Sequence, residues 1–338
     1  MFRMPRILPA LSACVLTSFL IAWPASPASA WGPGGHKVVA NIAFDRVDPA
    51  TRKSIVNVIS KHPDFDKRFA SRMPDDIKNG NADDRDRWIF LQAAIWPDLV
   101  RPNPPYHKES WHFINLPFFL TAHDKAVLED TIKPNVSMTL PNPLKDTDQL
   151  NCVQAFKLAE RTLTDADSTD EEKAISFCWL LHIAGDIHQP LHSTSLITRG
   201  RFHTSEGDRG GNGIKVKQGR NLHSYWDGLL GGDQSLNDIR GRAAAILADA
   251  DMKKSADKAA GELDIVAWVN ESNKIAKTFA YDELILKEVA AREADSSHPL
   301  HKVDLPAEYL KEAGRIAQRR VAEAGYRLAE ILKQIEEN

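Results

Sequence analysis

The chain has 338 residues, of which 43% are hydrophobic and 26% are charged, a composition typical of a globular protein that can bury a substantial core. Its formal net charge of −3 excludes a protein that coats nucleic acid by positive charge alone, but permits an enzyme that holds one phosphate through metal ions. After residue 30, no segment approaches the ~18 consecutive apolar residues of a membrane-spanning helix, so we expect no membrane anchor in the mature form.

Residues 1–30 have the pattern of a secretory signal peptide. The basic start "MFRMPR" is followed by the apolar run "ILPALSACVLTSFLIAW" and by "PASPASA", which ends in Ala28-Ser29-Ala30. We expect cleavage before Trp31 and export to the periplasm or the extracellular space. The segment "LSAC" also resembles a lipoprotein processing site, but the hydrophobic run continues past Cys14, which favours simple export.

Helical patterns dominate residues 31–338 and predict a mainly α protein with a single helical domain. Apolar residues recur at helical spacing from His36 to Val47. A capping-box pattern at Ser168 and Glu171 begins another helix, which Pro190 ends. Residues 222–230 predict a short helix, and residues 235–336 predict a series of amphipathic helices.

Residues 193–220 do not follow the helical pattern. This polar stretch contains six glycines, and "GIKVK" within it predicts one strand of a small β-hairpin. A long polar loop next to a candidate site is more often functional than accidental.

Two cysteines, Cys152 and Cys178, follow the expected cleavage site. In an exported chain they could form a disulfide, and two buried free thiols are an equally good interpretation.

Residue types that bind metals recur at regular spacing in the second half of the chain. In "LLHIAGDIHQPLH" (180–192), His182 and Asp186 are four residues apart and therefore share one face of a helix. His223 and Asp227 repeat this spacing in "HSYWD". His192, just after the helix stop, could fold back towards the same cleft.

The first half supplies further donors. Asp98 and His112 lie in "IWPDLVRPNPPYHKESWHFIN", while Trp31 and His36 flank the flexible turn "GPGG". An α-amino group has a pKa of about 7.7–8.0, so zinc could displace its proton at modest cost, which would explain cleavage directly before Trp31.

Together these donors are too many for one tetrahedral zinc and suit a cluster of three metal ions if one carboxylate bridges. The alternative is a buried hydrogen-bond network without metal. The complete set is Trp31, His36, Asp98, His112, His182, Asp186, His192, His223 and Asp227.

The motifs "WGPGGH", "WPDLVR", "WHFIN", "HIAGDIHQPLH", "GDRGGN" and "NLHSYWD" occur in this order within residues 31–232. This ordered set resembles the S1/P1 nuclease family, whose helical fold is shared with zinc phospholipases C. The resemblance implies three Zn²⁺ ions: one on Asp98, His112, His182 and Asp186, a second on His192, His223 and Asp227, and a third on the Trp31 amino terminus, His36 and the bridging Asp186.

The resemblance also implies roles beside the metals. Asp98 would act near the attacking water, Arg101 would hold the phosphate, and Phe113 would stack on a base. Asn115 stands where fungal members carry an acidic residue that reads the base, which leaves the base preference open. Pro97 stands where a small residue is usual, a milder departure.

The implied function is an exported, zinc-dependent phosphodiesterase that cleaves single-stranded DNA and RNA to 5′-phosphate products by a metal-activated water, with 3′-nucleotidase activity. We expect a monomer. A phospholipase C acting through the same trinuclear zinc site is the alternative, and a non-enzymatic zinc-storage protein is a third interpretation.

Overall fold

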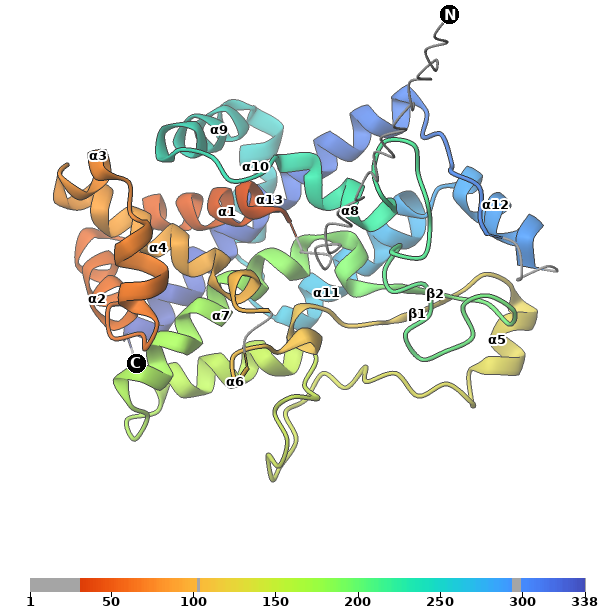
Figure 1. Ribbon diagram of the computed structural model, residues 1–338, viewed down its shortest axis with the longest axis horizontal. Coiled ribbons are helices and arrows are strands. Elements are labelled where there is room, and N and C mark those ends of the chain that lie inside the picture. Colours follow the sequence, from red (N-terminus) through yellow and green to blue (C-terminus); the bar gives the residue numbers. More distant parts are fainter. Residues whose placement is uncertain (1–30, 102–103, 294–298, 338) are drawn as a thin grey trace, which may run out of the picture.

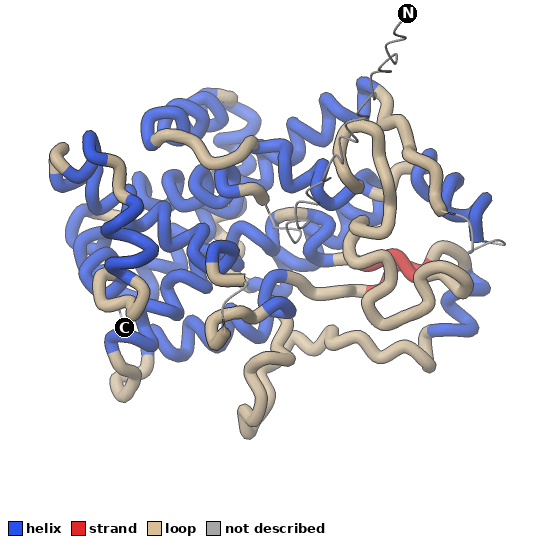
Figure 2. Tube along the Cα trace, viewed as in Figure 1, coloured by secondary structure: helices blue, strands red, loops and turns tan. Residues whose placement is uncertain are grey.

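The computed structural model describes residues 31–101, 104–293 and 299–337, so the expected signal peptide lies outside the described residues. Helices make up most of the described chain, which confirms the mainly α prediction (Figures 1 and 2). Among the described residues, no helix combines the length and the hydrophobicity that a bilayer crossing requires.

The helices follow one another in two runs along the chain. The first run is α1 (Pro33–Arg46), α2 (Pro49–Ile59), α3 (Asp75–Lys78), α4 (Ala82–Leu99), α5 (Ala122–Leu128), α6 (Cys152–Thr164) and α7 (Asp170–His188). The second run is α8 (Leu222–Asp227), α9 (Leu236–Ala248), α10 (Ala250–Ala259), α11 (Ile265–Ile275), α12 (Glu283–Glu293) and α13 (Ala307–Glu337). Short 3₁₀ or π turns are η1 (Phe65–Phe69), η2 (Ala70–Arg72), η3 (Glu109–His112), η4 (Pro190–Ser193), η5 (Gly228–Leu230) and η6 (Ala276–Ala280).

Helix α7 runs through the middle of the molecule, packed against α2, α4, α6 and α13 (Figure 1). From Phe177 to His188 every residue is buried, so this stretch has no solvent-facing side and all its polar groups need internal partners. The capping box is formed by Thr169 and Glu172, one residue after the predicted pair Ser168 and Glu171. The helix ends before Pro190, as the sequence predicts.

Helix α1 packs against α13 and α4. Gly325 permits the close approach of α13, because a Cβ there would lie 2.6 Å from Cβ of Ile42. Residues 34–44 of α1 are all buried, which fixes the rotation of the helix and therefore the direction of His36.

The predicted β-hairpin within residues 193–220 is wrong. Strand β2 (Ser195–Ile197) instead pairs in parallel with β1 (Pro117–Phe119), in a small sheet at one end of the molecule (Figure 2). The other edge of β2 is occupied by Asp208, whose backbone N–H donates to Leu196 O and whose carboxylate accepts from Leu196 N. The "GIKVK" segment therefore pairs elsewhere, through a bridge between Val216 and Val303.

Cys152, at the start of α6, and Cys178, on α7, are both buried and free, so the disulfide alternative is wrong for this structure. Burial raises the pKa of both thiols well above the ordinary value. The two cysteines therefore act as small apolar core residues.

Candidate metal centre

The predicted histidines and aspartates gather into three adjoining groups of ligand-type side chains. The Asp98 group contains Asp98, His112 and His182, the His36 group contains His36, His182 and Asp186, and the His192 group contains His192, His223 and Asp227. Within each group, the candidate ligand atoms lie within 4.8 Å of one another.

The Asp98 group joins α4, η3 and α7. His182 Nε2 lies 2.9 Å from His112 Nδ1 and 3.7 Å from Asp98 Oδ1, and the last two atoms are 4.0 Å apart. Asp186 Oδ2 completes the set at 3.0 Å from His112 Nδ1 and 3.2 Å from His182 Nε2. Bond lengths of about 2.0–2.1 Å place the ligand atoms of a tetrahedral zinc about 3.3–3.4 Å apart, so these four atoms fit one zinc ion.

The His36 group shares Asp186 with this set. Asp186 Oδ1 lies 3.2 Å from His36 Nε2, while Oδ2 faces His112 and His182. The imidazole of His36 stacks on that of His182 with a centroid separation of 4.0 Å. Because its two oxygens point into different groups, Asp186 has the geometry of a bridging carboxylate.

The His192 group joins η4 to α8. His192 Nε2 lies 3.1 Å from His223 Nε2, and Asp227 Oδ2 lies 3.5 Å from the same His223 atom. Gln189 Nε2 donates to Asp227 Oδ1 at 2.8 Å, which fixes the orientation of this carboxylate. Gln189 was not anticipated from the sequence, and its position between two histidines of "DIHQPLH" is the only signal that could have identified it.

Backbone carbonyls determine which ring nitrogens face the groups. Nδ1 of His182 lies 2.7 Å from Ala94 O, Nδ1 of His192 lies 2.5 Å from His112 O, and Nδ1 of His223 lies 2.7 Å from Gly210 O. A carbonyl can only accept, so each Nδ1 carries the proton and each neutral ring presents the lone pair of Nε2.

This tautomer assignment indicates that a cation belongs in the His192 group. With both Nδ1 atoms protonated, the neutral rings of His192 and His223 direct two lone pairs at each other across 3.1 Å. A metal ion satisfies both, as in zinc sites where the outer nitrogen donates to a carbonyl. In the His36 group, His36 Nε2 and Asp186 Oδ1 are buried and face each other at 3.2 Å without the geometry of a hydrogen bond.

Burial keeps most of these imidazoles neutral. Desolvation, reinforced by the charge of Arg101, lowers the pKa of His112 to about 3, and desolvation together with His192 lowers that of His223 to about 3. Desolvation also lowers the pKa values of His36 and His192. Neutral imidazole is the form that binds metals.

His182 behaves differently from the other histidines of the groups. Burial lowers its pKa, but the charges of Asp186 and Asp98 outweigh burial and raise it.

An open cleft of about 780 Å³ lies next to the His192 group and is lined in part by His112, His192 and His223. The predicted substrate residues Arg101, Phe113 and Asn115 also line it. Arg101 is largely buried, and its Nη2 lies 2.9 Å from Asp98 Oδ1, so this guanidinium is held at the border between the Asp98 group and the cleft.

Residues 31–337 match the family model of the S1/P1 nucleases. The chain belongs to the S1/P1 nuclease family. It is therefore a nuclease, a hydrolase of a metal-dependent family, and the three groups of histidines and aspartates are its candidate metal sites.

Two relatives align with nearly the whole chain. The nuclease is 24% identical to nuclease S1 of Aspergillus oryzae, with 98% of each chain aligned. It is 22% identical to endonuclease 1 of Arabidopsis thaliana, over 95% of this chain and 92% of that protein. Endonuclease 4 of A. thaliana is 26% identical to this chain over 59% of the chain's length, and the aligned part covers 55% of endonuclease 4.

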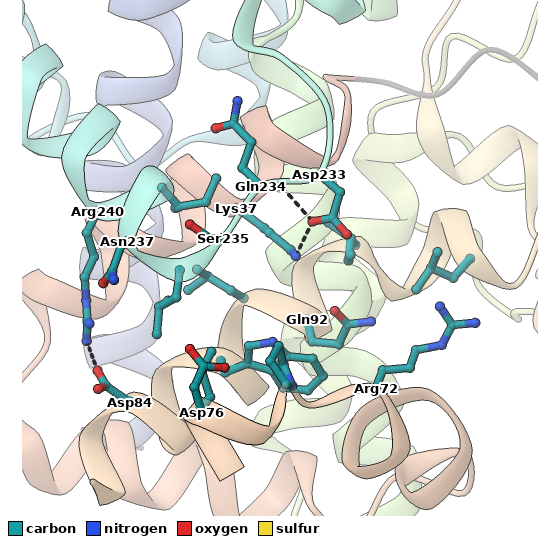
Figure 3. Close-up of a pocket in the computed structure, with 18 residues that line it drawn as sticks. Lys37, Arg72, Asp76, Asp84, Gln92, Asp233, Gln234, Ser235, Asn237 and Arg240 are labelled. Carbon is teal, nitrogen blue, oxygen red and sulfur yellow. Dashed lines mark hydrogen bonds and ion pairs between the residues drawn. The ribbon is translucent and has the colours of Figure 1, made fainter. Parts of the chain in front are cut away.

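The nuclease has a second cavity, of about 450 Å³, between α1, α4 and α9 (Figure 3). None of the residues that line it belongs to the three groups, so it is separate from the candidate metal sites. Lys37 Nζ lies 2.5 Å from Asp233 Oδ1 at its wall. Lys37 follows His36, and Asp233 lies shortly after Asp227, so this ion pair connects the segments that carry two of the groups.

Trp31, predicted to supply the terminal amine, lies next to the groups. Its side chain is buried against Gly35, where a Cβ would lie 2.6 Å from Trp31 Cβ. The adjacent Gly32 N–H donates to Asp227 O at 2.8 Å. His188, by contrast, faces away from the metal sites and contacts Arg327, with His188 Nε2 2.9 Å from Arg327 Nη1.

Proposed function

We propose that the nuclease is a zinc-dependent phosphodiesterase that cleaves single-stranded DNA and RNA to 5′-phosphate products and also has 3′-nucleotidase activity. The observation that carries this proposal is the gathering of three adjoining ligand groups, two of which share the carboxylate of Asp186. Nitrogen and oxygen donors without thiolates, in sets of three and four, suit Zn²⁺.

Three Zn²⁺ ions are proposed, one in each group. Asp98, His112, His182 and Asp186 would hold the first, and His192, His223 and Asp227 the second. His36 and Asp186 would hold the third together with the amino group of Trp31, which requires cleavage before that residue. The pattern of residues 1–30 supports this cleavage and export to the periplasm or the extracellular space.

The bound ions would supply the activation of the attacking water and offset charge on the phosphate. Asp98 can accept a hydrogen bond from the attacking water and orient it, since Arg101 and the histidines keep its carboxylate ionised. Burial raises its pKa, but His182 and then Arg101 outweigh burial and lower the value to about 2. Arg101 donates to the phosphoryl oxygens from the cleft side. Its positive charge there stabilises the negative charge that develops on these oxygens in the transition state.

Phe113 and Asn115 support single-strand selectivity. Both line the cleft beside His112 and are partly exposed. A base that swings out of its stack can lie on Phe113, whereas a duplex resists this by the cost of unstacking. Asn115 offers an amide that can donate and accept, so it does not impose the preference of a carboxylate.

The cleft is lined largely by charged and polar side chains, which favours nucleic acid over the lipid substrate of a phospholipase C. We expect the protein to act as a monomer.

The deciding experiment measures zinc content and compares two substrates on the processed protein. Three zinc ions per chain and cleavage of single-stranded DNA are expected, with no turnover of phosphatidylcholine. Lipid hydrolysis without nucleic-acid cleavage would instead support the phospholipase, and full zinc loading without either reaction would support zinc storage.

A further inference from the structure

Arg209 has a backbone conformation that is unusual for an arginine. Its φ is +59°, and it is the only non-glycine residue with positive φ among those that the structure describes. Its neighbours at positive φ are Gly207, Gly210 and Gly211, which tolerate this conformation without strain. Glycine would be the least strained residue at position 209 as well, so the arginine side chain needs another explanation.

The loop around Arg209 is fixed by buried contacts. The carboxylate of Asp208 accepts hydrogen bonds from Leu196 N, from Gly211 N and from the hydroxyl of Tyr281. Asn212 Nδ2 donates to Arg209 O at 2.8 Å. The loop therefore holds position 209 in place whatever its side chain does.

The same loop contacts the candidate metal centre. Gly210 O, one residue after Arg209, accepts from Nδ1 of His223 at 2.7 Å. The side chain of Arg209 lines the open cleft together with Arg101, Phe113 and His223. The guanidinium of Arg209 therefore lies in the cleft that also contains His112, His192 and His223, but it belongs to none of the ligand groups.

Ion pairing within the protein does not account for the arginine. Its Nη2 lies 3.5 Å from Glu109 Oε1, and its Nε lies 3.7 Å from Glu206 Oε2. All three side chains are more than 60% exposed. Exposed pairs with such long separations contribute little stability.

We propose that Arg209 forms a phosphate subsite that binds a backbone phosphodiester of the single-stranded substrate, next to the phosphodiester held at the metal centre. This subsite rests on the proposed function, because it assumes a polynucleotide in the cleft. Lys108 and Arg220 line the same cleft, and with Arg101 and Arg209 they make four basic residues there against three carboxylates, those of Glu109, Asp148 and Glu206. The chain carries a net charge of −3, so the cleft is less acidic than the chain as a whole.

The test measures binding of a fluorescent oligothymidine of about 12 nucleotides, a length typical of single-strand sites, to the zinc-loaded protein. Phosphorothioate linkages slow its hydrolysis, and anisotropy is recorded over a range of salt concentrations. Each phosphate contact on a single strand contributes about −0.7 to the slope of log K against log salt. Arg209→Ala should weaken binding about fivefold at low salt and make this slope shallower by about 0.7, while Arg209→Lys should retain the slope.

A second variant separates binding from folding. Arg209→Gly should relieve the backbone strain and raise the Tm, yet lose as much oligonucleotide affinity as Arg209→Ala. Arg315→Ala serves as the matched control, because Arg315 is also an exposed arginine, with 52% of its side chain accessible, and lies away from the cleft. It should bind the oligonucleotide like the wild type.

The outcomes distinguish the subsite from the proposed function. If the wild type cleaves single-stranded DNA but the alanine and glycine variants keep the wild-type salt slope, the subsite is wrong and the proposed function stands. If the wild type does not cleave but the slope changes in the variants, the proposed function fails and the subsite stands. If the wild type neither binds nor cleaves, both fail.

Discussion

Gly185 lies against the imidazole of His36, and a Cβ at position 185 would be 2.6 Å from Nδ1 of that ring. The smallest residue on α7 therefore sets the place of a candidate ligand on α1. Glycine in a helix interior costs stability relative to alanine, so its presence here is explained by this contact rather than by the helix.

Gly185→Ala should displace His36 and reduce zinc binding in the His36 group. The new methyl group meets a buried ring, so we also expect overpacking to lower the free energy of unfolding by about 1–3 kcal/mol. Zinc content by mass spectrometry and urea unfolding with chelator test the two effects separately. A variant that keeps three zinc ions would show that this contact does not position the ligand.

Asp186→Asn should release at least one zinc ion and abolish cleavage. The side-chain volume is kept, but the charge that faces both His36 and His112 is lost. Asp257→Asn, at an exposed position, is the matched control and should retain metal and activity. Full metal content and activity in Asp186→Asn would contradict the bridging role.

Gln189→Met should lower zinc affinity in the His192 group by about 10–100-fold, the usual effect of losing a hydrogen bond to a metal ligand. The variant removes the donor that holds Asp227 while roughly keeping the side-chain volume. Competition with a fluorescent zinc chelator measures the affinity. Gln218→Met provides the control, since Gln218 is exposed and donates to Asp304 instead.

Leaving a peptide attached before Trp31 should remove one zinc ion, because a peptide nitrogen cannot replace the terminal amine as a ligand. The processed chain and a chain with a short N-terminal extension are compared by metal analysis and circular dichroism. Equal zinc content in two folded forms would count against the terminal ligand.

The pH dependence of stability should change in Asp208→Asn. Burial raises the pKa of Asp208 from 3.8 to about 6, although hydrogen bonds from Leu196 and Tyr281 oppose this shift. The folded state thus holds this proton more tightly than the unfolded state. The contribution of Asp208 is fully present below pH 3.8 and is lost as the pH rises through about 6.

Urea unfolding of the two proteins between pH 4 and 7 measures this contribution. The stability of the wild type relative to Asp208→Asn should decrease as the pH rises through this window and level off above it. A constant difference would mean that Asp208 is ionised throughout.

The sequence was informative about the site because two pairs of candidate ligands lie close together in the chain. His182 and Asp186, like His223 and Asp227, share a helix face through a four-residue spacing, and the structure places the two members of each pair in the same group. Long-range contacts were less predictable. The partner of the 195–197 strand comes from residues 117–119, and no local pattern indicates such a pairing.

The residues that orient the ligands were harder to predict than the ligands themselves. Ala94 and Gly210 act through their backbone carbonyls, which any residue type supplies. Gln189 acts through an amide that is common on protein surfaces. The two carbonyls are identified by the three-dimensional structure alone, and Gln189 has no sequence signal beyond its place in the histidine motif.

The two oxygens of Asp186 point into different groups, whereas the His192 group has all three of its members to itself. A change in the orientation of this one carboxylate therefore alters two groups at once, whereas the His192 group keeps its geometry.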